Sequence, residues 1–79
     1  MKHFQTSVFS EYIAELLKYS LHIDAGMFFG KDFIKLQRFE AKVINARNNG
    51  YLSQNEYKAL YSIATKLHSE YRKALNLDR

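Results

Sequence analysis

Residues 53–75 carry the pattern that most restricts what this chain can fold into. Ser53 and Glu56 have the S-x-x-E spacing of a helix capping box, and apolar side chains then recur every three or four residues. This spacing gathers them on one face of an α-helix, whereas a strand needs alternation at every second residue. The sequence therefore predicts a helix here, with a face made of Tyr57, Leu60, Tyr61, Ala64, Leu67, His68, Tyr71 and Leu75.

Two earlier segments have the same periodicity, and the chain contains no proline to interrupt them. The first runs from about Ser7 to Ile23, with an apolar face of Phe9, Ile13, Leu16, Leu17 and Leu21. The second runs from Asp32, expected as its N-cap, to Asn49, and Gly50 follows it as a left-handed C′ residue. Its expected buried residues are Phe33, Leu36, Phe39 and Val43, with Ile44 on the flank.

Three amphipathic helices joined by short connections predict one all-α domain over residues 1–79, folded as a small three-helix up-down-up bundle. A chain of 79 residues has a small core, and without cysteine it has no disulfide to support it. We therefore expect dimerisation to complete the bundle as a homodimer.

The start, Met1 to Phe4, is followed by a segment that Glu11, Glu15 and Lys18 interrupt. This segment has neither the apolar run of a signal peptide nor the length of a membrane span. The expectation is a cytoplasmic protein that does not engage a membrane.

Positive charge gathers in the second half of the chain. Residues 1–28 carry a net charge of −1, whereas residues 31–79 carry +5. At helical spacing, four cations and two amides of the middle segment share one face, away from Leu36 and Val43. This expected anionic-partner face consists of Lys31, Lys35, Arg38, Lys42, Asn45 and Asn49. Cations release counterions from phosphates and asparagine reads adenine edges, so the face suits nucleic acid; the alternative is an ordinary solvated helix surface.

Aromatic residues mark a second candidate surface. Phe28 and Phe29 lie between Gly26 and Gly30, where polar turn residues are usual. They either close one end of the bundle or dock on another molecule. The expected apolar docking or dimer patch consists of Phe28, Phe29, Tyr57, Tyr61 and Tyr71, and the alternative places the tyrosine rings at the rim of the core with solvated hydroxyls.

Catalytic, metal-ligating and cofactor-binding patterns are absent from the sequence. His3, His22 and His68 lack metal-ligand spacing, and no nucleophile elbow or phosphate-binding glycine loop occurs. The loop from Asn45 to Glu56 resembles an EF-hand loop in the position of Gly50, but Arg47 occupies a calcium-ligand position. We expect no enzyme activity, no metal and no cofactor.

Two family resemblances arise in the last hairpin. The run Leu52 to Glu56, continued by Tyr61-Ser62 and by Ala64 to Glu70, resembles the long helix of the Hha-type modulators, which bind a nucleoid-structuring protein. Thr65, Lys66 and Leu67 stand where that family has a charged cluster. Ala46-Arg47, Gly50 to Ser53 and Glu56-Tyr57 are similar to the second hairpin of the four-helix-bundle proteins encoded in ribosomal RNA intervening sequences, whose relatives bind nucleic acid.

Both resemblances imply a role in nucleic-acid machinery, and neither assigns a site residue. The expected function is a non-enzymatic regulator or inhibitor that docks on a protein partner there. The composition, rich in lysine, asparagine, tyrosine and phenylalanine, is typical of AT-rich bacteria and of their phages and plasmids. The alternative is direct binding of nucleic acid by the basic face of the second helix.

Overall fold

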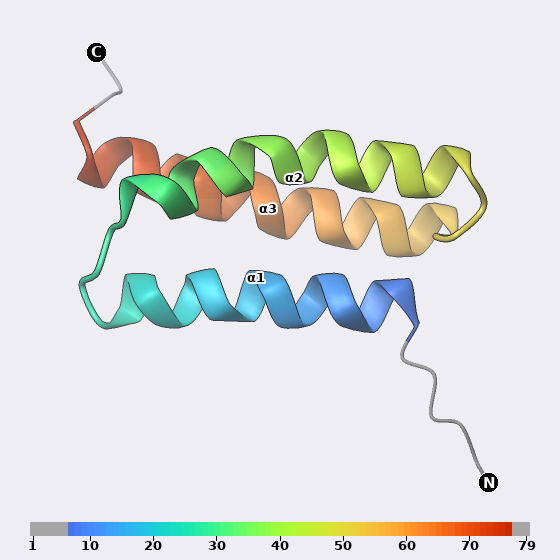
Figure 1. Cartoon of the computed structure of the whole chain (residues 1–79), viewed down its shortest axis with the longest axis horizontal. Helices are drawn as coiled ribbons and strands as arrows, with labels where there is room; N and C mark the ends of the chain where they lie inside the picture. Colours follow the sequence, from blue (N-terminus) through green and yellow to red (C-terminus); the bar gives the residue numbers. More distant parts are fainter. Residues whose placement is uncertain (1–6, 77–79) are drawn as a thin grey trace, which may run out of the picture.

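The structure is a computed structural model that describes residues 7–76, so the start of the chain discussed above lies outside the described residues. Three α-helices follow one another: α1 (Val8–Asp24), α2 (Gly30–Asn48) and α3 (Gln54–Ala74). Figure 1 shows α2 running opposite to α1 and α3, and residues 7–76 contain no strand. The predicted all-α, up-down-up bundle is confirmed. Within these residues, no helix has the length and apolar character to cross a membrane.

Local hydrogen bonds fix the helix ends close to where the sequence predicts them. The Ser53 hydroxyl accepts from the Glu56 backbone N–H at 3.1 Å, and Glu56 Oε1 accepts from the Ser53 N–H at 3.0 Å, which completes the capping box. Ser7 caps α1 by accepting from the Ser10 N–H at 3.1 Å. Gly50 has a φ of +82°, the left-handed conformation expected after the end of α2.

The start of α2 differs from the prediction. The N-cap is Phe29, whose extended backbone precedes Gly30, and it makes no side-chain capping bond. The predicted N-cap Asp32 is wrong, because this residue lies inside the first turn of α2 and its side chain is only 2% exposed. Its carboxylate bonds to side chains of the other two helices instead of to its own helix end.

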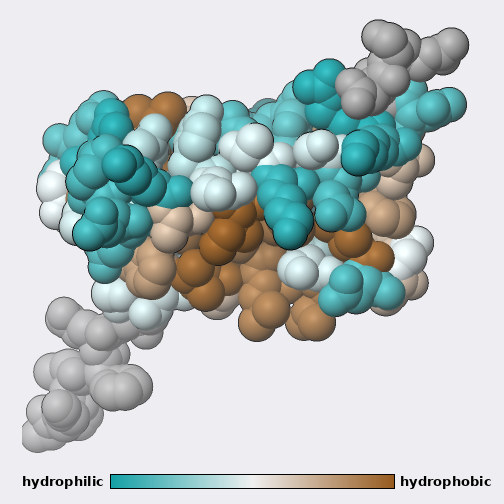
Figure 2. Space-filling view, turned by 180° about the vertical axis from the view of Figure 1, so that it is seen from behind, coloured by the Kyte–Doolittle hydropathy of each residue, from teal (hydrophilic) through white to brown (hydrophobic). Residues whose placement is uncertain are grey.

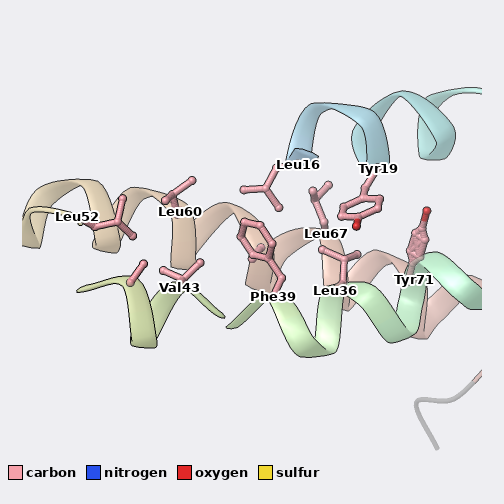
Figure 3. Close-up of a cluster of buried hydrophobic side chains, with 11 residues drawn as sticks. Leu16, Tyr19, Leu36, Phe39, Val43, Leu52, Leu60, Leu67 and Tyr71 are labelled. Atoms are coloured by element: carbon pink, nitrogen blue, oxygen red, sulfur yellow. The ribbon is translucent and has the colours of Figure 1, made fainter. Parts of the chain in front are cut away.

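A single hydrophobic core lies between the three helices. In Figure 3, Leu16 and Tyr19 of α1 point toward side chains of α2 and α3. Tyr12 extends this packing, with its ring edge-on to Phe39 at 5.4 Å between centroids. The buried residues are Leu16, Tyr19, Leu36, Phe39, Val43, Ala46, Leu52, Leu60, Ala64, Leu67 and Tyr71.

Helix α1 is rotated relative to its predicted apolar face. Leu17 and Leu21 are 56% and 57% exposed, whereas Tyr19 is fully buried. Tyr19 tolerates burial because its hydroxyl donates to Glu15 Oε2 at 2.7 Å, so the buried polar atom is satisfied. The expected burial of Leu17 and Leu21 is therefore wrong, and α1 keeps an apolar strip on its outer side.

Candidate functional site: a basic groove between α1 and α2

The predicted basic stripe lies on the surface of α2 along most of its length. Its six members, Lys31, Lys35, Arg38, Lys42, Asn45 and Asn49, are all exposed. Helix α1 borders one side of this stripe, so the stripe forms one wall of a groove instead of a flat face. The surroundings of each cation therefore depend on what α1 presents.

The groove has a volume of about 350 Å³. Its walls carry four cations and one carboxylate, and the rings of Tyr19 and Phe39 lie among them. The lining residues are Glu15, Lys18 and Tyr19 of α1 with Lys35, Arg38, Phe39 and Lys42 of α2. Positive charge is in excess among these residues, and an excess of one sign of charge along a cleft concentrates the local field.

One of the four cations is already paired. Lys42 Nζ donates to Glu15 Oε1 at 2.8 Å, and it lies 4.8 Å from the centroid of the Tyr12 ring and 5.5 Å from that of Phe39. Burial raises the pKa of the Glu15 carboxyl, but hydrogen bonds from Lys42 and Tyr19 outweigh it and hold that pKa below its usual value. Lys42 and Glu15 thus act mainly as a bond between α1 and α2.

The other three cations, Lys18, Lys35 and Arg38, carry the positive charge of the groove that Glu15 does not neutralise. Lys18 Nζ lies 5.4 Å from the centroid of the Tyr19 ring. Lys35 and Arg38 make no ion pair with any of residues 7–76. The three side chains line the same groove from two helices, and charged donors of this kind form the strongest hydrogen bonds to phosphates and carboxylates.

Lys18 and Glu15 are the groove residues that the sequence pattern did not bring together with the stripe. Both lie on α1, and they meet Lys35, Arg38 and Lys42 only in the folded bundle, where α1 and α2 run antiparallel (Figure 1). Lys31, Asn45 and Asn49 do not line the groove: Lys31 lies over the Phe29 ring at 5.6 Å, and the two asparagines lie beyond Lys42 toward the end of α2. Of the six predicted residues, Lys35, Arg38 and Lys42 therefore line the groove, and the other three lie on the exposed surface outside it.

The aromatic patch is also divided. Phe28 packs edge-on against Tyr71 at 5.4 Å and closes one end of the bundle, while Phe29 is 39% exposed and lies edge-on to His22. Tyr71 is fully buried, and its hydroxyl donates to Asp32, so it is a core residue with no surface for a partner.

The two remaining members of the aromatic patch lie in the first half of α3. Tyr57 is half-buried beneath the Arg47 guanidinium at 4.2 Å, and Tyr61 is 38% exposed. About 20 Å of helix separates Tyr57 from Tyr71 along α3. The five aromatic residues therefore do not form one continuous surface.

Residues 7–76 include no group of three or more histidine, cysteine, aspartate or glutamate side chains placed to hold a metal ion. No protein-family model matches the chain, and the comparisons with curated proteins and with solved structures give no significant match. The two resemblances of the last hairpin therefore stay predictions.

Proposed function

We propose that this chain is a non-enzymatic binding protein that holds the phosphate backbone of a nucleic acid in the groove between α1 and α2. The proposal is supported above all by one observation, the convergence of Lys18, Lys35 and Arg38 on a single groove. Three cations from two helices bracket an extended anion better than a row along one helix does. An arginine among them adds a planar fork that donates two parallel hydrogen bonds to a phosphate.

The three cations of the groove limit how strongly and how selectively it binds nucleic acid. Three phosphate contacts predict a log–log salt slope of roughly −2.7, which is a loss of about 40-fold in affinity between 50 and 200 mM salt. Such contacts carry no base sequence, so binding through this groove is expected to be independent of sequence. The chain would then regulate nucleic-acid machinery by covering a stretch of nucleic acid or by bringing a protein partner to it.

The test is a titration of labelled double-stranded and single-stranded DNA and RNA at low and physiological salt. Reversing both charges in Lys35→Glu/Arg38→Glu is expected to abolish binding at every salt concentration while circular dichroism stays helical, since both residues are exposed. The matched control is Lys58→Glu/Lys73→Glu on α3, which makes the same change in net charge on exposed residues outside the groove. Equal losses of nucleic-acid binding in the two variants would mean that net charge alone drives binding. This result would contradict the proposed role of the groove.

A second candidate is docking on a protein partner of nucleic-acid machinery. It is favoured by the loop between α1 and α2, where Met27 and Phe29 are 42% and 39% exposed beside Lys31. Exposed apolar anchors next to a cation fit an acidic protein surface with an apolar pocket. Phe29→Ser is expected to abolish this binding without changing the salt dependence of nucleic-acid binding. Loss of both activities in Phe29→Ser would contradict two separate surfaces.

A further inference from the structure

Near the end of the bundle where α2 connects to α3, three planar side chains lie against one another. The Arg47 guanidinium is 4.2 Å from the centroid of the Tyr57 ring. The Tyr57 centroid is in turn 5.7 Å from that of Tyr61, with 34° between the two ring planes. Tyr61 is 38% exposed. This planar stack, consisting of Arg47, Tyr57 and Tyr61, therefore includes a ring that a ligand can reach.

The charge of Arg47 is not neutralised by a carboxylate. Its Nη2 donates to Asn48 Oδ1 at 3.3 Å, and it forms no ion pair with any of residues 7–76. The side chain is half-buried against Tyr57, so its position is fixed by packing. A guanidinium held in this way stacks on flat groups and still donates hydrogen bonds to an anion.

Carboxylates are scarce around the planar stack. Residues 41–55 contain neither aspartate nor glutamate. Glu40 precedes Arg47 by two helical turns, or about 10 Å along α2. Glu56 belongs to the capping box, where its Oε1 accepts from the Ser53 N–H. The surroundings of the stack therefore favour an anionic ligand.

The surface beside the planar stack also suits an anionic backbone. Thr65 follows Tyr61 by one turn of α3 and lines a hollow of about 200 Å³ together with His68, Ser69 and Arg72. Hydroxyl and guanidinium groups donate hydrogen bonds to phosphate oxygens, and no carboxylate of residues 7–76 lines this hollow. In Figure 2, hydrophobic atoms gather in a band over α1 and its boundary with α3, whereas the surface of α3 beyond this band is mostly hydrophilic to neutral.

Exposed amides connect the planar stack with the basic groove. Helical spacing places Asn45 and Asn48 on the surface of α2 between Lys42, which lines the groove, and Arg47. Both asparagines are exposed. An extended chain that leaves the groove can therefore continue around the end of α2 to the stack without passing a carboxylate of residues 41–55.

A ligand that fits this surface has flat aromatic faces as well as negative charge. Single-stranded nucleic acid has both, because its unpaired bases stack on tyrosine and arginine while its phosphates attract cations. A duplex offers no free base faces, since its bases are stacked on one another. An acidic peptide supplies the charge without a series of flat groups. The chemistry therefore favours a single strand.

We propose that the planar stack of Arg47, Tyr57 and Tyr61 binds unpaired bases of a single-stranded nucleic acid, and that the hollow at Thr65 holds the adjoining backbone. This inference rests on the proposed function, because the groove between α1 and α2 supplies the main hold on the phosphates. The stack adds a preference for single strands, which phosphate contacts alone do not give. None of its three residues lines the groove, so the two contributions can be removed separately.

Strands with and without bases separate stacking from phosphate contacts. The probes are fluorescently labelled oligo(dA) and an abasic deoxyribose-phosphate strand of the same length, titrated at the same salt concentration. The wild type is expected to bind oligo(dA) at least about fivefold more tightly, since stacking of even one base contributes that much. Equal affinities for the two strands would overturn the stack and leave the groove intact. Absence of binding to either strand would overturn the proposed function and this inference with it.

Variants of Tyr61 assign the preference to the planar stack. Tyr61→Ala is expected to lose most of the preference for oligo(dA) and to keep its affinity for the abasic strand. Tyr61→Phe retains the ring and should retain the preference. Both variants should stay helical by circular dichroism, because the side chain is exposed. Lys35→Glu/Arg38→Glu should abolish binding of both strands alike, and full preference for oligo(dA) in Tyr61→Ala would overturn the proposal.

Discussion

The carboxylate of Asp32 is the point where side chains from all three helices meet. Its Oδ2 accepts a hydrogen bond from the Tyr71 hydroxyl at 3.1 Å and lies 2.6 Å from His22 Nδ1. A buried carboxylate is costly unless such partners replace its water. Its position in the first turn of α2 adds the favourable field of the helix end. Asp32 therefore joins the ends of α1 and α3 to the start of α2.

Removing one hydrogen-bond partner of Asp32 measures how much this arrangement stabilises the fold. Tyr71→Phe keeps the ring packing but deletes a hydrogen bond to a charged group, so we expect a loss of about 1.5–3 kcal/mol in the free energy of unfolding by urea. The control is Tyr51→Phe, because Tyr51 is 65% exposed, and its effect should stay within about 0.5 kcal/mol. Similar losses in the two variants would mean that the buried bond contributes nothing.

The stability of Tyr71→Phe should also depend less on pH than that of the wild type under alkaline conditions. Burial and the nearby Asp32 charge raise the pKa of Tyr71 from 10.0 to about 12. The folded state therefore keeps a proton that the unfolded chain loses, and stability falls as pH rises between these two values. Tyr71→Phe should lose less stability over this interval, as measured by urea unfolding at several alkaline pH values. An unchanged alkaline loss would contradict the assignment to Tyr71.

At the scale of helices and their connections, Gly50 and Gly30 differ in backbone conformation. Gly50 has a φ of +82°, which side-chain-bearing residues adopt at a cost, whereas the φ of Gly30 is not positive. A Cβ at either position would meet no atom within 4 Å, so the contrast isolates the backbone.

We expect Gly50→Ala to destabilise the fold by about 1–2 kcal/mol. Gly30→Ala should be neutral or stabilising by up to about 1 kcal/mol, because it restricts the unfolded chain at a compatible helical position. Urea denaturation of both variants measures the difference, and equal effects would contradict the conformational argument.

The bond between Glu15 and Lys42 holds α1 to α2 and also neutralises part of the groove. Because the pKa of Glu15 is lowered in the folded state, its contribution to stability is present above its usual value of 4.5 and is lost as pH falls through the folded pKa. Glu15→Gln should therefore be less stable than the wild type at neutral pH and show a smaller loss on acidification.

Glu15→Gln also tests the groove, because it removes the one carboxylate among the lining cations. The variant should bind nucleic acid more tightly, by a few fold at low salt, although it is less stable. Weaker binding by a variant that remains folded would indicate that Glu15 positions Lys42 for the ligand.

For the whole molecule, neighbouring leucines of α1 have different surroundings. Leu16 is 2% exposed and lies in the core, whereas Leu17 is 56% exposed. Leu16→Ala should cost about 2–5 kcal/mol at any protein concentration. Leu17→Ala should leave the dilute chain within about 0.5 kcal/mol of the wild type. Thermal unfolding at several protein concentrations separates loss of core packing from loss of association, and a large effect of Leu17→Ala at high dilution would contradict its exposed position.

Sequence patterns alone predict the three helices, the capping box at Ser53, the left-handed Gly50 and the exposed stripe of α2. These features depend on residues within about one or two helical turns of one another, so local spacing was sufficient to predict them. The same reasoning placed Leu36, Phe39 and Val43 in the core, because α2 has one narrow apolar face.

The buried face of α1 depends on packing between helices, because apolar residues cover a wide arc of that helix and its tyrosines contribute to the core. The rotation that buries Tyr19 exposes Leu17, brings Glu15 to Lys42, and adds Lys18 to the basic groove. It also brings His22 to the carboxylate of Asp32, which Tyr71 of α3 reaches independently and which the sequence pattern predicts as a helix cap. Each of these contacts joins residues on different helices, and local periodicity holds no information about how one helix is turned against another.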